Sequence, residues 1–235
     1  MAAHGRRRPT DAPGGINLLV RQGYEVHVLD NVERGRSGFA PGLWDGEAIL
    51  RSQEEAWSIF RIGPPEGFAD RTPFPGSLFP VEAFDTFARM MVPRWLTTTP
   101  LHVDALVALL QRTGPSIVIC HSQGGEIALD AARRVPELFD GFVGIEPSTV
   151  LEDAADLRSI PTVLFAGDFL ETSPYAIKRD QDWQSWIETL DRDGTPAQLL
   201  KRPEGLYGFT HFPMLDHHGD RCLNTCLKTL RDFTP

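Results

Sequence analysis

Short apolar runs alternate with amphipathic segments through the second half of the chain. The runs at 116–120, 142–145 and 161–166 are short, apolar and mostly rich in β-branched residues, as in the strands of a buried parallel sheet. Apolar residues recur at helical spacing over 126–134 and 183–190. Strands that alternate with helices predict an α/β fold, a mostly parallel sheet with helices on both faces.

Weaker signals extend this pattern toward both ends. Residues 197–200 predict a last strand, and 221–230 predict a last helix. Near the start, 16–22 is typical of the end of a helix that Gly23 terminates. The segment 24–30 that follows has the alternation expected of a strand.

The stretch from 35 to 80 interrupts the regular pattern, because five prolines break it in its second half. Helices are predicted within and after it at 53–61, 81–92 and 103–111, and Pro93 ends the second of these. A long connection inside a compact domain is more typical of a lid or a binding segment than of a passive link.

The composition fits a globular protein. The chain has 235 residues, 41% hydrophobic and 23% charged, and is long enough to bury its own core. Its net charge of −9 argues against sequence-independent nucleic-acid binding, which needs basic patches. No apolar run reaches 18 residues, so no membrane span is predicted. The N-terminus has no signal-peptide apolar core, which makes a cytoplasmic location the default expectation.

The sequence Cys-His-Ser-Gln-Gly at 120–124 joins a predicted strand to a predicted helix. It matches the elbow pattern G-x-S-x-G, with Cys120 in place of the first glycine, and makes Ser122 the candidate nucleophile. The backbone N–H of Gln123 would supply half of an oxyanion hole. The structural alternative is a loop serine that caps the following helix.

A serine nucleophile needs a histidine base and a carboxylate that orients the base. In this architecture the acid precedes the histidine along the chain. His211 lies after the last predicted strand and before the last helix, where that histidine is expected. Glu146 and Asp168 each end a predicted strand, and sequence spacing alone does not choose between them.

The residues after His211 also suggest a weaker metal hypothesis. Asp216, His217, His218, Asp220 and Cys222 lie close together, but no HxxxH or CxxC spacing is present. The two histidines are better explained as solvated residues near the last helix. No Gly-rich phosphate loop of the dinucleotide or P-loop type occurs. We therefore expect neither a metal nor an organic cofactor.

Other segments strengthen the elbow signal and extend from about residue 16 to the C-terminus. They are Arg21-Gln22-Gly23-Tyr24 with Val28-Leu29-Asp30, Arg34-Gly35-Arg36-Ser37, the run at 55–64, Met91-Val92-Pro93-Arg94-Trp95-Leu96, Glu146-Pro147, Phe165-Ala166-Gly167-Asp168 and Thr210-His211. Together with the elbow, they make the chain resemble the α/β-hydrolases, in particular one branch of bacterial carboxylesterases.

This resemblance implies a single α/β-hydrolase domain over 1–235, with a cap at about 39–100. The branch takes its triad acid as a glutamate after the strand next to the nucleophile strand, which favours Glu146 over Asp168. Aromatic residues would then be candidate pocket walls, although ordinary core or cap packing is the favoured explanation for any single one. They are Trp57, Phe60, Phe74, Phe79, Phe84 and Trp95.

The chain departs from the family pattern at its start, where the first strands are not found and the fold is expected to be N-terminally shortened. His4-Gly5 is then the remnant of an oxyanion loop, with Gly5 or Arg6 donating the second N–H.

The resemblance implies a serine hydrolase that cleaves small-molecule carboxylic esters through an acyl-enzyme. The alternatives are a weak or inactive hydrolase-like binding protein, or a lactonase, thioesterase or acyltransferase with the same triad. The family also leaves export possible.

Overall fold

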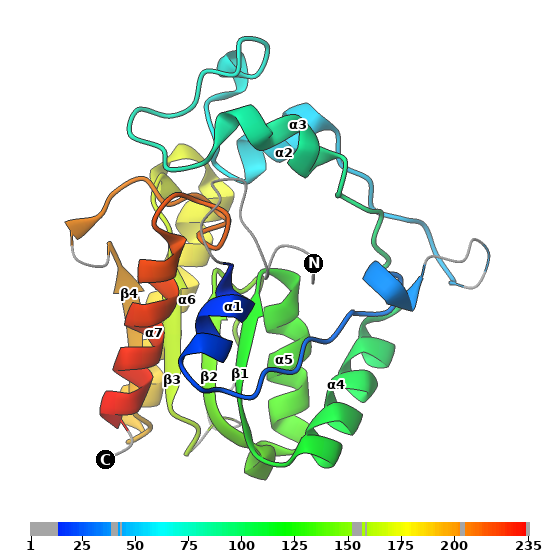
Figure 1. Ribbon diagram of the computed structural model, residues 1–235, viewed down its shortest axis with the longest axis vertical. Helices are drawn as coiled ribbons and strands as arrows, with labels where there is room; N and C mark the ends of the chain where they lie inside the picture. The colour runs from blue at the N-terminus through cyan, green and yellow to red at the C-terminus, as the bar shows by residue number, and fades with distance from the viewer. Residues whose placement is uncertain are drawn as a thin grey trace. The chain divides into compact units, whose positions relative to one another are not determined.

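The structure is a computed structural model that describes residues 14–38, 42, 44–151, 157, 159–202 and 205–233 (Figure 1). The chain divides into two compact units. Unit 1 consists of Met1–Leu101 and Leu206–Leu223, and unit 2 of His102–Gly205 and Asn224–Pro235. Each unit is described separately.

Unit 2 is built on a four-stranded sheet in the order β1-β2-β3-β4. The strands are β1 (Ser116–His121), β2 (Phe139–Ile145), β3 (Thr162–Ala166) and β4 (Ala197–Lys201). Every neighbouring pair is parallel, and His121 lies opposite Ile145 where β1 and β2 end. The carboxyl ends of these strands therefore meet at one edge of the sheet, where open α/β sheets place their ligands.

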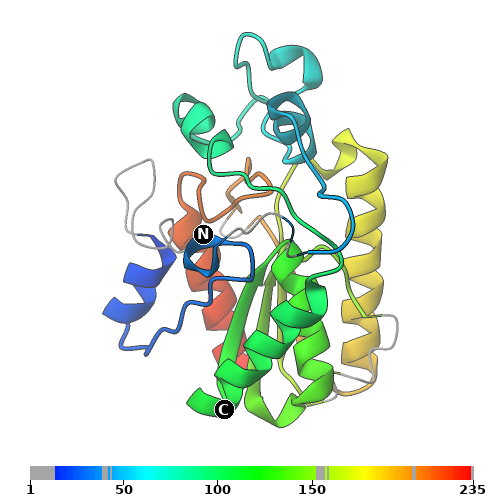
Figure 2. The ribbon, with the colours of Figure 1, turned by 90° about the vertical axis from the view of Figure 1, so that its right-hand side faces the viewer.

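Helices cover both faces of this sheet. They are α4 (Thr99–Thr113), α5 (Gln123–Arg134), α6 (Pro174–Arg192) and α7 (Gly219–Phe233). Buried residues of α4, α5 and α6 share one core with the sheet residues Phe142 and Leu164. On the other face, Leu230 of α7 packs against Gly141 of β2. Figure 2 shows α6 and α7 on opposite sides of the strands.

Unit 1 contains α1 (Gly15–Arg21), α2 (Gln53–Ile59) and α3 (Phe84–Ala88), with short 3-10 turns at Gly35–Ser37, Pro65–Gly67 and Val81–Ala83. A capping box starts α2, since Ser52 and Glu55 bond each other's backbone N–H groups. Its Trp57 packs edge-on against Phe84 of α3, with ring centroids 5.2 Å apart. The described residues of unit 1 therefore pack around an aromatic core.

The structure confirms the predicted α/β class, and the four strands of the second half appear where the pattern predicts them. The predicted strand at 24–30 is wrong, because these described residues form no β-ladder. Alternation of apolar and polar residues favours a strand, but a strand also needs a neighbouring strand whose backbone pairs with its N–H and C=O groups.

The helix predicted at 81–92 is shorter than expected. Only Phe84–Ala88 is α-helical, although Met91, beyond the end of this helix, still packs against the aromatic core. Phe84, Phe87 and Ala88 are buried, whereas Met90 and Val92 are more than 40% exposed. Across the described residues, no helix combines the length and the apolar character that crossing a membrane requires.

Candidate active site

The turn at Ser122 is strained, as a nucleophile elbow requires. Ser122 follows β1 directly and precedes α5, and its φ of 52° and ψ of −121° are rare for a residue with a side chain. Its N–H donates to the Ile145 carbonyl (3.2 Å), and its carbonyl accepts from the N–H groups of Gly125 and Ser148 (2.8 Å each). Backbone groups at the end of β2, just after β2 and in α5 thus fix this conformation.

Gln123 is the first residue of α5, so its backbone N–H lies in the first turn of the helix, at its N-terminus. Such N–H groups, together with the helix dipole, favour an anion. The close approach that the elbow needs occurs at Gly125, where an added Cβ would lie 2.9 Å from the Cα of Pro147. Burial raises the pKa of the Cys120 thiol to about 12, which keeps this neighbour of the serine uncharged.

Glu146 and Asp168 both lie at the same sheet edge as Ser122, beyond β2 and β3. Glu146 is 1% exposed, has a φ of 48°, and its Oε1 accepts a 2.6 Å hydrogen bond from the Gly167 N–H. Asp168 is also buried, but its Oδ1 accepts from the Arg202 guanidinium Nε at 2.9 Å. The two candidate acids therefore have different partners.

His211 belongs to unit 1, where it is 8% exposed. Its imidazole stacks on the ring of Phe60, with centroids 5.4 Å apart and an interplanar angle of 8°. Its backbone N–H donates to the Phe60 carbonyl at 3.1 Å. Phe212 meets both rings edge-on. The sequence shows Phe60 only as one of several aromatic residues, because the stack joins positions 151 residues apart.

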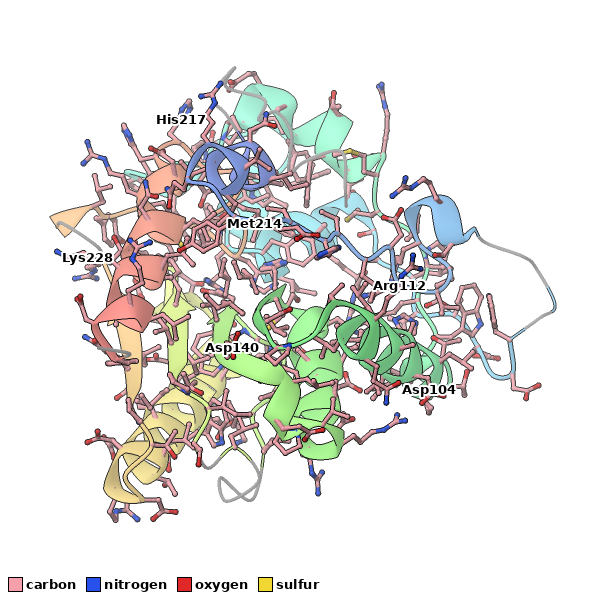
Figure 3. All side chains as sticks on the ribbon, turned by 60° about the horizontal axis from the view of Figure 1, so that its bottom comes forward. Asp104, Arg112, Asp140, Met214, His217 and Lys228 are labelled. Carbon is pink, nitrogen blue, oxygen red and sulfur yellow. The ribbon has the colours of Figure 1, made fainter. Side chains whose placement is uncertain are left out.

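Asp216 is fully buried in the loop that carries His211. Its carboxylate accepts hydrogen bonds from the backbone and the side chain of Thr210. The neighbouring His217 is exposed, as expected, and is labelled with Met214 in Figure 3. Among the described residues, no group of three or more His, Cys, Asp or Glu side chains could hold a metal ion.

The predicted site residues fall into three groups. Unit 2 brings Ser122, Gln123, Glu146 and Asp168 to one edge of its sheet, and unit 1 holds His211. The two predicted oxyanion donors at positions 5 and 6, Gly5 and Arg6, lie outside the described residues, as do residues 39–41 and 43 of the predicted cap.

No protein-family model matches the chain. It is 28% identical over 149 residues to "Probable secreted lipase phiG" of Fungal sp. (strain ATCC 74256), a match that covers 60% of this chain and 40% of that protein. It is also 28% identical over 118 residues to "Lipase LipV" of Mycobacterium tuberculosis (strain ATCC 25618 / H37Rv), covering 48% and 44%. The matches thus span less than half of each curated relative's length.

A solved structure agrees over more of the chain. It is described as "The Atomic Resolution Structure of a Novel Bacterial Esterase", with a TM-score of 0.88 and 27% sequence identity, and the match covers 99% of this chain and 77% of that one. The parallel sheet, the strained serine between β1 and α5 and the match to this structure show an α/β-hydrolase fold. In this fold the chain is similar to a bacterial esterase and to two lipases.

Proposed function

We propose that the chain is a carboxylesterase-type serine hydrolase with Ser122 as its nucleophile. The observation that carries this proposal is the positive φ of Ser122, 52°, between the parallel strand β1 and the N-terminus of α5. Strain of this kind costs about 1–3 kcal/mol and persists where the surrounding structure enforces it, often at functional sites. A serine that only caps a helix needs no such conformation, and Ser122 makes no side-chain cap bond.

In the proposed mechanism, His211 removes the proton of the Ser122 hydroxyl as the oxygen attacks the ester carbonyl carbon. The tetrahedral intermediate collapses, the C–O bond to the alcohol breaks, and His211 returns the proton to the leaving alkoxide. Water then attacks the acyl-enzyme with His211 again as the base, which releases the acid and restores Ser122. The Gln123 N–H stabilises the oxyanion in both steps, and Gly5 or Arg6 is proposed for the second donor.

We assign Glu146 as the acid that orients His211. It follows β2, the strand paired with the nucleophile strand, and its carboxylate is buried beside a backbone donor. Asp168 already pairs with a permanent cation, Arg202, which lowers its capacity to stabilise an imidazolium.

The nucleophile is tested by fluorophosphonate labelling and by hydrolysis of a short p-nitrophenyl ester. The unaltered chain should be labelled and should hydrolyse the ester, while Ser122→Ala should lose both with its far-UV circular dichroism unchanged. Ser116→Ala, at the opposite end of β1, is the matched control and should keep both. Unlabelled but folded protein would reject the proposal in favour of a hydrolase-like binding protein.

The acid is tested by comparing Glu146→Gln with Asp168→Asn. Loss of the orienting carboxylate in a triad lowers kcat by up to about 10⁴-fold. We expect a loss of at least about 10²-fold for Glu146→Gln and less than about tenfold for Asp168→Asn. The reverse ranking would transfer the role to Asp168. A panel of ester, lactone and thioester substrates then separates an esterase from a lactonase or a thioesterase.

A further inference from the structure

We propose that Asp216 is a positioning residue for His211, acting through Thr210. This inference rests on the proposed function, because it concerns the base of that reaction. Asp216 is 0% exposed, and an ionised carboxylate is costly to bury without hydrogen-bond donors. Its donors come from Thr210, the residue directly before the histidine.

Thr210 gives Asp216 two hydrogen bonds. Its backbone N–H donates to Oδ2 at 2.6 Å, and its hydroxyl lies 3.0 Å from Oδ1 and 3.1 Å from Oδ2. The same hydroxyl oxygen accepts from the backbone N–H of Phe212 at 3.1 Å. A fully buried carboxyl depends on such partners, so Thr210 and Asp216 hold each other within this loop.

The backbone N–H groups of three consecutive residues are therefore committed to fixed partners. Thr210 donates to Asp216, His211 donates to the Phe60 carbonyl, and Phe212 donates to the Thr210 hydroxyl. The N–H of Asp216 in turn donates to the Phe212 carbonyl at 3.2 Å, which closes the loop on itself. Two of the three fixed N–H groups depend on the Asp216–Thr210 pair, and they flank His211.

The consequence concerns catalysis more than folding. A general base must lie within hydrogen-bond reach of the proton that it removes, and a displacement of about 1 Å can cost about 10²-fold in rate. Neither Asp216 nor Thr210 is assigned a chemical step, so their loss should lower kcat and leave KM nearly unchanged.

The test compares Thr210→Val with Thr210→Ser, since valine keeps the shape and removes the hydroxyl while serine restores it. We expect kcat per folded molecule to fall about 10-fold or more in Thr210→Val, with KM within twofold, and to stay within threefold in Thr210→Ser. Asp216→Asn should lose about 30–100-fold. If Asp216→Asn fails to fold, the comparison of Thr210→Val with Thr210→Ser still tests the positioning role.

Amide hydrogen exchange supplies a readout that does not depend on activity. Thr210→Val should lose protection at His211 and Phe212 selectively, with protection in the sheet of unit 2 unchanged. An unchanged kcat in Thr210→Val, or an equal loss in Thr210→Ser, would overturn the positioning role and leave the esterase proposal standing. Absence of fluorophosphonate labelling in the unaltered chain would instead reject the proposed function itself.

Discussion

The turn at Ser122 and the loop at His211 are held in place by different means. In unit 2, neighbouring parallel strands fix the Ser122 backbone through main-chain hydrogen bonds to Ile145 and Ser148. In unit 1, main-chain bonds to Phe60 and Leu78 also hold the His211 loop, but two side chains add to them: the buried carboxylate of Asp216 and the ring of Phe60.

This difference determines how each region should respond to mutation. Main-chain bonds in a sheet do not depend on side-chain identity, so the elbow should tolerate most substitutions that leave room for the backbone. The histidine loop depends on particular side chains and on one close backbone contact, so it should be disturbed by changes spread along the sequence.

Gly208→Ala should have the largest effect on stability. Gly208 has a φ of +110°, and an added Cβ would lie 2.9 Å from the Gly76 carbonyl carbon and closer still to its oxygen. The Gly208 carbonyl also accepts from the Leu78 N–H at 2.8 Å, so the loop cannot move away without losing that bond. We expect the free energy of unfolding in urea to fall by about 3 kcal/mol or more, from combined strain and overpacking.

Gly205→Ala is the matched control for this substitution. Gly205 also has a positive φ, +74°, but an added Cβ there would meet nothing within 4 Å. It should cost only about 1 kcal/mol, the penalty of the left-handed backbone. Equal losses in the two variants would mean that the approach to Gly76 does not hold the histidine loop.

Gly125→Ala should cause the next largest loss of stability, and this substitution tests the packing of the elbow. An added Cβ would overlap the side chain of Pro147, one residue beyond Glu146. Overpacking of this kind costs about 1–3 kcal/mol. Gly124→Ala is the control, because its nearest contact is the Cys120 Cβ at an ordinary 3.5 Å. That variant should be neutral or more stable, since alanine is about 1 kcal/mol better than glycine inside a helix. Urea unfolding of both variants measures the difference.

The same contrast explains what could be predicted from the sequence. The strands and the elbow were accessible, because apolar runs and a strand–serine–helix pattern are local signals. The contacts of Phe60 and Asp216 could not be predicted in this way. Phe60 and His211 stack although they are 151 positions apart, which leaves no periodic pattern in the sequence. In the sequence, an aspartate near histidines resembles a metal ligand as much as a residue that stabilises a loop. The segment 24–30 shows what a local pattern cannot predict. Alternation of apolar and polar residues favours a strand, but a strand also needs a neighbouring strand to pair with, and alternation does not specify one.

Phe60→Leu should have a moderate effect on catalysis. It removes the ring stacked on His211 but keeps the backbone carbonyl that accepts the histidine N–H. Aromatic pairs contribute about 0.5–1.5 kcal/mol beyond burial, so kcat should fall by about 2- to 10-fold. Phe68→Leu is the control, because Phe68 packs edge-on against Trp57 and Phe84 in the same unit. Its loss should lower stability without changing kcat, and equal kcat losses would remove the special role of the Phe60 stack.

The smallest expected effect is a dependence of stability on pH that comes from Cys120, two residues before Ser122 in the elbow. Burial raises the pKa of this thiol from about 9 to about 12, because the thiolate is poorly solvated there. Between these values the unfolded chain loses the proton while the folded chain keeps it. Stability is therefore fully present below pH 9 and falls as the pH rises. At pH 9 the loss should be about 0.4 kcal/mol relative to pH 7. Urea unfolding at pH 7 and at pH 9 should show this loss in the unaltered chain. In Cys120→Ala the difference in unfolding free energy between pH 7 and pH 9 should be smaller by about 0.4 kcal/mol. The variant should keep the proposed rate of ester hydrolysis within twofold, because the neutral thiol takes no part in the proposed proton transfers. A large loss of activity would mean that the sheet-held elbow, like the histidine loop, depends on a particular side chain.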